Sequence, residues 1–138
     1  MAAMTIAEAI DAIEETYEFM LAYAAQGRRR DEEDEGSGIR ERLMRAEAAL
    51  GVIAAATAES LNGASGASAG TSGTAAATAE FLDVVKADAV RARAAFRLVL
   101  AQRAIGSQIV DNLNATTHVR TLLTDLFLLD ETIKISGI

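Results

Sequence analysis

The fold is decided by the stretch AEFLDVVKADAVRARAAFRLVLAQRAIGSQIV at residues 79–110. Its apolar residues recur at spacings of three and four, which is the period of an α-helix. Two such stripes lie on different faces, the first being Leu82, Val85, Ala89, Ala92, Phe96 and Val99, and the second Ala94, Leu98, Ala101, Ile105 and Ile109. A helix that is apolar on two sides is not a simple surface helix. We predict that this segment is the central element of the chain, or that its second face meets another chain.

Three other segments have the same helical period. Thr5 and Glu8 have the spacing of a capping box, which marks the start of a helix. Gly106 and Asn112 are candidate sites for a kink or a break. Between the second and third helices the sequence NGASGASAGTSG is rich in small residues, which is typical of a flexible connector. We predict helices at about 5–26, 39–61, 75–112 and 115–134, with the connector at about 62–74.

These segments predict an all-α protein that forms one domain over residues 1–138. Short turns after the first and third helices favour an antiparallel four-helix bundle with up-down-up-down topology. The third helix is expected to be longer than its neighbours. The charged stretch GRRRDEEDEGSG at 27–38 is interpreted as the first turn, because cations are favourable at a helix C-terminus and anions at the next N-terminus.

Composition excludes several classes of protein. The chain has 138 residues, of which thirty are alanine, and it contains no Pro, Cys or Trp. A net charge of −7 argues against general nucleic-acid binding, which requires a cationic surface. The sequence contains neither a signal peptide nor an apolar run long enough to span a membrane. We expect a cytoplasmic protein without membrane contact, and secretion without a cleavable signal stays open.

Chemistry-bearing motifs are scarce. His118 is the only histidine, so a di-iron site built from paired Glu-x-x-His motifs is excluded. The segment HVRTLLTD at 118–125 is similar to the His-box of sensor kinases, but its Arg falls one place early and the usual Pro is missing. We interpret His118 as a partly exposed residue near a helix start. No catalytic residue, cofactor or metal site is predicted.

Arginines give the chain one alternative function. Arg93 and Arg97 flank the first apolar stripe, and a guanidinium can hold a carboxylate in bidentate geometry. Together with Tyr17 and Tyr23 they could line a pocket between helices, as in a helical sensor or small-ligand-binding domain. The competing interpretation is that these cations pair with acids of a neighbouring helix.

The favoured prediction is a non-enzymatic helical protein that acts through self-association, or as an accessory or adaptor subunit of a helical partner. It depends on the two-sided segment at 79–110 and on the apolar cluster LFLL at 126–129, which together exceed what slender Ala-rich helices bury within one chain. The predicted interface residues are Leu98, Ile105, Ile109, Leu126, Phe127 and Leu129.

Overall fold

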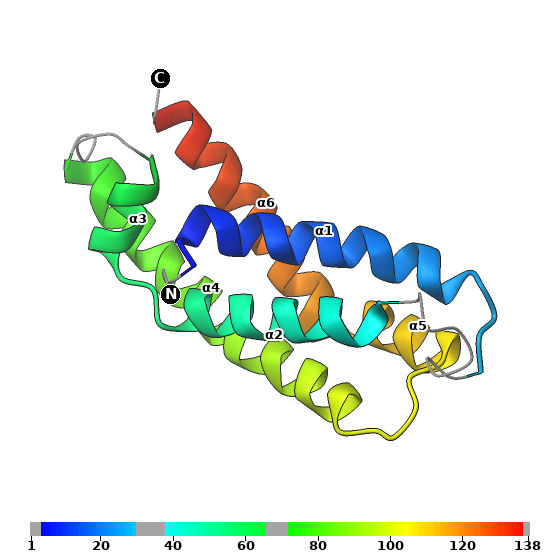
Figure 1. Ribbon diagram of the computed structural model, residues 1–138. Coiled ribbons are helices and arrows are strands. Elements are labelled where there is room, and N and C mark those ends of the chain that lie inside the picture. The colour runs from blue at the N-terminus through cyan, green and yellow to red at the C-terminus, as the bar shows by residue number, and fades with distance from the viewer. Residues whose placement is uncertain (1–3, 30–37, 66–71, 137–138) are drawn as a thin grey trace.

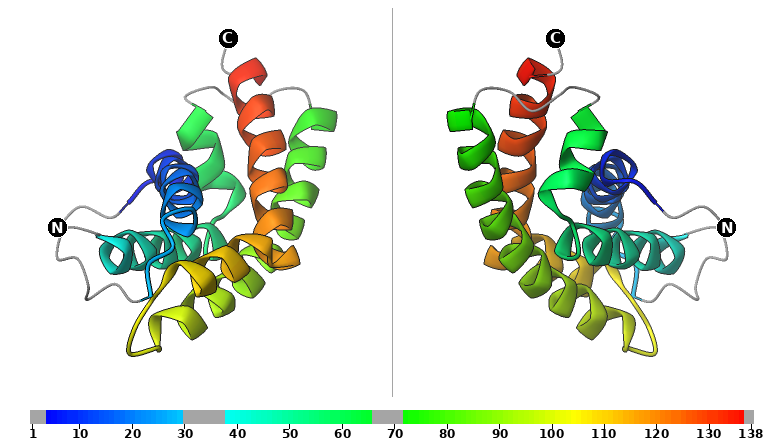
Figure 2. Two further views of the ribbon diagram at one scale, coloured as in Figure 1. Left: turned by 90° about the vertical axis from the view of Figure 1, so that its right-hand side faces the viewer. Right: turned by 90° about the vertical axis from the view of Figure 1, so that its left-hand side faces the viewer.

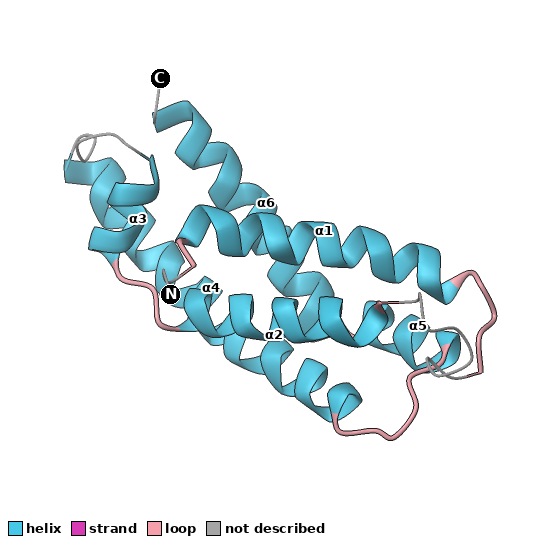
Figure 3. Cartoon of the chain, viewed as in Figure 1, coloured by secondary structure: helices cyan, strands magenta, loops and turns pink. Residues whose placement is uncertain are grey.

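The computed structural model describes residues 4–29, 38–65 and 72–136, and all of the regular secondary structure in these ranges is helical. Six helices follow one another in these ranges: α1 (Ile6–Ala24), α2 (Ile39–Ala54), α3 (Ala58–Ser65), α4 (Ser72–Leu100), α5 (Ser107–Ala115) and α6 (Thr117–Ser136) (Figure 1, Figure 3). The predicted all-α class is confirmed.

Helix α1 begins with the predicted capping box. The backbone N–H of Glu8 donates to the Thr5 hydroxyl at 3.1 Å, and the backbone N–H of Thr5 donates to the Glu8 carboxylate at 3.0 Å. These two bonds satisfy groups that the first turn of a helix leaves without partners. The apolar stripe of α1 then packs into the core through Ile10, Ile13 and Met20, which are almost fully buried.

The predicted second helix at 39–61 is divided in two. Helix α2 ends at Ala54, and α3 begins at Ala58. The break follows from Thr57, whose hydroxyl accepts from the backbone N–H of Ser60 at 3.1 Å, while the Ser60 hydroxyl accepts from the backbone N–H of Thr57 at 2.9 Å. Such reciprocal bonds cap a new helix rather than continue an old one. Thr57 is therefore an exposed cap and not part of an apolar stripe.

The third helix, predicted at about 75–112 with Gly106 as a candidate break, is divided in two: α4 ends at Leu100 and α5 begins only at Ser107. Arg40 of α2 binds the end of α4, donating to the carbonyl oxygens of Leu100 at 3.3 Å, Gln102 at 2.7 Å and Arg103 at 2.8 Å. A cation with several donors stabilises these carbonyls, which no longer have partners within the helix. The chain then turns inward, so that Ile105 is fully buried.

Both predicted connecting segments are only partly described. Helical structure reaches Ser65 and resumes at Ser72, so the connector expected at 62–74 is helical at both ends. Its centre, 66–71, lies outside the described residues, as do 30–37 of the charged stretch. Gly27 and Gly38 flank that stretch with φ of 68° and 66°, a left-handed conformation that glycine adopts without strain.

The helices pack around one core cluster to which all six contribute. Helix α2 lies between α1 and α4, α5 packs on α1, and α6 packs mainly on α4. Helices α4 and α6 run antiparallel and side by side (Figure 2). The predicted four-helix up-down-up-down bundle is not confirmed, since α3 and α5 are separate elements and the long helices are not aligned along one common direction.

Candidate functional site

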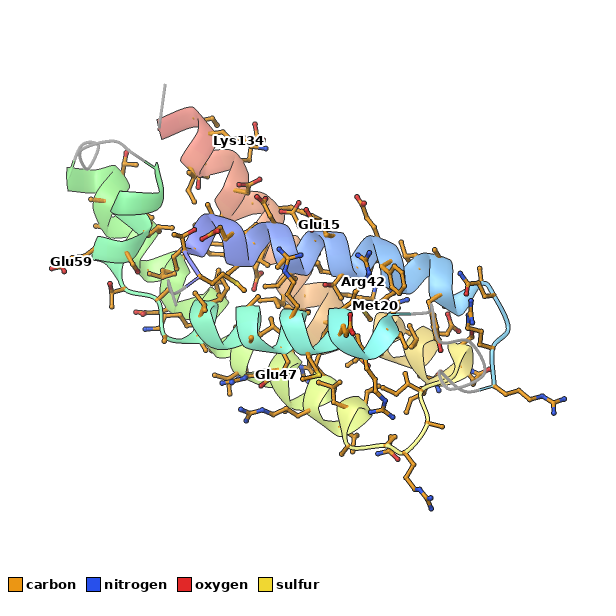
Figure 4. All side chains as sticks on the ribbon, viewed as in Figure 1. Glu15, Met20, Arg42, Glu47, Glu59 and Lys134 are labelled. Atoms are coloured by element: carbon orange, nitrogen blue, oxygen red, sulfur yellow. The ribbon has the colours of Figure 1, made fainter. Side chains whose placement is uncertain are left out.

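The two arginines of the predicted ligand pocket are paired with an acid of the same chain. Glu47 of α2 lies between α2 and α4 (Figure 4), and one of its carboxylate oxygens accepts from Nε of Arg93 at 2.6 Å and from Nε of Arg97 at 2.8 Å. Burial of Glu47 acts to raise the pKa of its carboxyl, but the hydrogen bonds from both arginines outweigh burial and hold that pKa below its usual value. Arg93 and Arg97 thus bind α4 to α2 through Glu47, so they are not arranged as an open site for the carboxylate of a ligand.

The two tyrosines of that pocket lie elsewhere. The Tyr23 side chain is only 1% exposed, and its hydroxyl donates to the carbonyl oxygen of Ile105. Tyr17 is half-buried on α1 and packs against the core cluster. The structure therefore does not bring Tyr17, Tyr23, Arg93 and Arg97 together around one cavity.

Replacing Glu47 by Gln is expected to lower the free energy of unfolding by about 1–2 kcal/mol, because two guanidinium groups lose their common anion in a half-buried setting. Urea denaturation measures the change. Glu15→Gln is the matched control, since Glu15 pairs with Arg45 at 3.3 Å with both side chains more than half exposed. That variant is expected to change stability by less than about 0.5 kcal/mol. Equal losses in the two variants would contradict this assignment.

The six predicted interface residues divide between core and surface. Ile105, Leu126 and Leu129 are at most 2% exposed within the chain, and Ile109 is partly buried against the core. Only Leu98, at 67% exposure, and Phe127, at 52%, face solvent. The predicted second face of the third helix is therefore not one surface, because the break after Leu100 turns Ile105 inward.

The clearest unpaired apolar surface lies on α6. Its exposed side repeats at alternating spacings of three and four, and we call this stripe the outer face of α6: Thr121, Thr124, Leu128, Glu131 and Ile135. Leu128 is 56% exposed and Ile135 is 64% exposed, and Phe127 lies beside them. A groove of about 360 Å³ adjoins the N-terminal half of this face, and it is lined by Thr117, Arg120, Thr121, Thr124 and Asp125.

The apolar surface extends from α6 onto α4. Asp125 of α6 lies against Asp88 of α4, and this contact shows the register of the two antiparallel helices. Val84 lies one turn before Asp88 on α4. Because the helices are antiparallel, it is opposite the turn of α6 that follows Asp125, which contains Leu128. Val84 is 46% exposed. Apolar side chains exposed on two adjoining helices are typical of an interaction surface.

Comparisons with protein-family models, curated proteins and solved structures gave no match.

Other candidate sites are weaker. A polar groove of about 310 Å³ lies where α1 meets α5, and it is lined by Ala24, Gly27, Arg28, Ser107, Gln108 and Asp111. His118 is exposed in the first turn of α6. Within the described ranges, no three His, Asp or Glu side chains gather in a way that could hold a metal ion. None of the helices described is long and apolar enough to cross a membrane.

Sequence reasoning missed the acids that face α6. One carboxylate oxygen of Glu14 on α1 is buried, and so is one carboxylate oxygen of Asp125 on α6. Neither oxygen has a hydrogen-bond partner among the described residues. A usable signal was present at Asp125, which has Leu122, Leu126 and Leu129 at helical spacings of three, one and four. That position lies at the edge of a buried face rather than opposite it.

Proposed function

We propose that this chain is a non-enzymatic helical protein that acts through association, either with a second copy of itself or as an accessory subunit of another helical protein. The observation that carries the proposal is the outer face of α6, where Leu128 and Ile135 are more than half exposed while the opposite face of the same helix forms part of the core. A helix with one buried stripe and further apolar side chains on its exposed side is suited to pack against another helix.

The arrangement of the stripe supports a helical partner. Its alternating spacing of three and four is that of a coiled-coil seam, in which side chains of one helix insert between those of another. Val84 widens the apolar surface towards α4, and Glu131 supplies a charged position within the stripe. The ligand-binding alternative has weaker support, because Arg93 and Arg97 are occupied by Glu47.

Light scattering after size exclusion tests the self-associating form. The wild-type chain, with a protomer mass of 14.5 kDa, is expected to elute as a dimer or larger species at low micromolar concentration. The double variant Leu128→Gln, Ile135→Gln is expected to be monomeric, since two apolar contacts are replaced by polar groups that must be desolvated.

Met44→Gln is the control, because Met44 is 59% exposed but lies on α2, away from the outer face of α6. It is expected to keep the wild-type mass. A monomeric wild-type chain would exclude self-association. The accessory-subunit form then requires that one defined partner co-purify with the wild-type chain and not with the double variant.

A further inference from the structure

Helix α6 meets α4 at a contact between two acids. Towards α4, Asp125 lies against Asp88, and the Asp125 Oδ2 atom is buried without a hydrogen-bond partner among the described residues. Asp88 is itself largely buried, with its side chain 15% exposed, and it pairs with Arg91 of its own helix at 3.0 Å. Two carboxyl groups thus meet at the main contact of α6, with Arg91 paired to Asp88 and with Arg120 lining the same groove as Asp125.

A second group of acids lies where the charges of α6 reach α1. The charges of Asp130 and Lys134 of α6 act on Glu14 of α1, and the Glu14 Oε1 atom is buried without a hydrogen-bond partner among the described residues. Lys134 pairs with Asp130 at 3.2 Å, on the part of α6 labelled in Figure 4. The charge of Lys134 partly offsets that of Asp130 at Glu14, and Asp11 and Glu18 of α1 add further negative charge around Glu14.

Two ionised carboxylates in contact repel each other, whereas a proton held between them forms a strong hydrogen bond. Burial, followed by the hydrogen bond and charge of Asp88, raises the pKa of Asp125 to about 7. Burial and then the charge of Asp130 raise the pKa of Glu14 as well. Glu59 of α3 and Asp111 of α5, on the other helices that contact α6, are not among the groups that shift Asp125.

We propose that the contact of Asp125 with Asp88 forms a proton-operated latch, which holds α6 on α4 when it is protonated and loosens α6 when the proton leaves. The latch acts on α6 because this helix packs mainly on α4. It does not depend on the association proposed above.

The direction of the pH effect follows from linkage. A carboxyl whose pKa is higher in the folded than in the unfolded state binds its proton more tightly when folded, so its contribution is full at low pH and is lost as pH rises. For Asp125 the window runs from the ordinary value of 3.8 to about 7. The packing of α6 on α4 is therefore most stable in mild acid, and its stability decreases as the pH rises towards neutrality and above.

Hydrogen exchange followed by mass spectrometry, corrected for intrinsic rates, tests the latch. In the wild-type chain the protection of α6 amides is expected to fall about tenfold between about pH 6 and about pH 8, because a group with a folded-state pKa of about 7 loses its proton over that window. Amides of α1 and α2 are expected to change much less.

Asp125→Asn keeps the shape of the side chain and donates a permanent hydrogen bond to Asp88, so α6 protection is expected to stay within about twofold over the same window. Asp88→Asn changes the member of the contact that lies on α4, and it is expected to keep α6 protection equally constant over this pH range. Asp83→Asn, an exposed position on α4, is the control and is expected to follow the wild-type curve. The latch would be overturned if the protection of α6 amides in the wild-type chain did not change with pH. It would also be overturned if that protection fell equally in Asp125→Asn, or if the amides of α1 and α2 lost protection equally.

Discussion

Replacing Gly106 by alanine is expected to lower the free energy of unfolding by about 3 kcal/mol, because the added methyl group has no space. A Cβ at this position would collide with the carbonyl oxygen of Arg29 and would lie 2.8 Å from that of Arg28. Both neighbours are backbone atoms, which cannot rotate away as a side chain does. The φ of Gly106 is −90°, so the cost comes from the close approach and not from backbone strain.

The contact that would be lost joins the end of α1 to the start of α5. The backbone N–H of Ser107 donates to the carbonyl oxygen of Arg28 at 2.8 Å, and the Ser107 hydroxyl donates to the carbonyl oxygen of Tyr23 at 2.6 Å. The same hydroxyl accepts from the backbone N–H of Arg28 at 2.8 Å. A shift of Gly106 would break these bonds together, and buried polar groups without partners are costly.

Urea denaturation measures the loss, with Gly73→Ala as the matched control. Gly73 lies in α4 with nothing within 4 Å of an added Cβ. Alanine there is expected to stabilise the chain by up to about 1 kcal/mol, because it has the higher helix propensity. If Gly106→Ala were as stable as wild type, the tight junction between α1 and α5 would not exist in solution.

The elements that sequence predicts correctly are those fixed by local spacing. The capping box at Thr5 and the buried stripe from Leu82 to Val99 depend on residues three or four positions apart, and both are present. The end of α4 depends on Arg40, about sixty positions earlier in the chain, and no local pattern contains that contact. The low helix propensity of glycine makes Gly106 a candidate break. The reason that glycine is needed there is the close approach of the Arg28 and Arg29 backbone, which no local pattern reveals.

The candidate site was predictable to a smaller extent. The stretch LFLL at 126–129 is apolar throughout, yet its first and last residues lie in the core while the two middle residues face solvent as α6 turns. The acid contact of Asp125 with Asp88 joins helices whose relative level is set by packing, so sequence spacing cannot reveal it. What composition showed was only that acids are numerous, and their pairing is a property of the tertiary fold.

Leu126→Ala is expected to lower the free energy of unfolding by about 3 kcal/mol, while Phe127→Ala is expected to cost less than about 1 kcal/mol. Leu126 is fully buried, so truncation removes apolar contacts and leaves a cavity that its neighbours fill only in part. Phe127 is 52% exposed, and much of its ring already contacts water in the folded chain. Urea denaturation provides both values.

These two adjacent residues separate a role in folding from a role in association. If the outer face of α6 binds a partner, Phe127→Ala should weaken the oligomer seen by light scattering while leaving the protomer stable, since an exposed aromatic side chain contributes mainly once it is covered. Leu126→Ala should do the reverse at temperatures where it remains folded, because its side chain points into the core. Equal losses of stability in the two variants would mean that α6 is buried on both sides, and the outer face of α6 would then no longer be available for a partner.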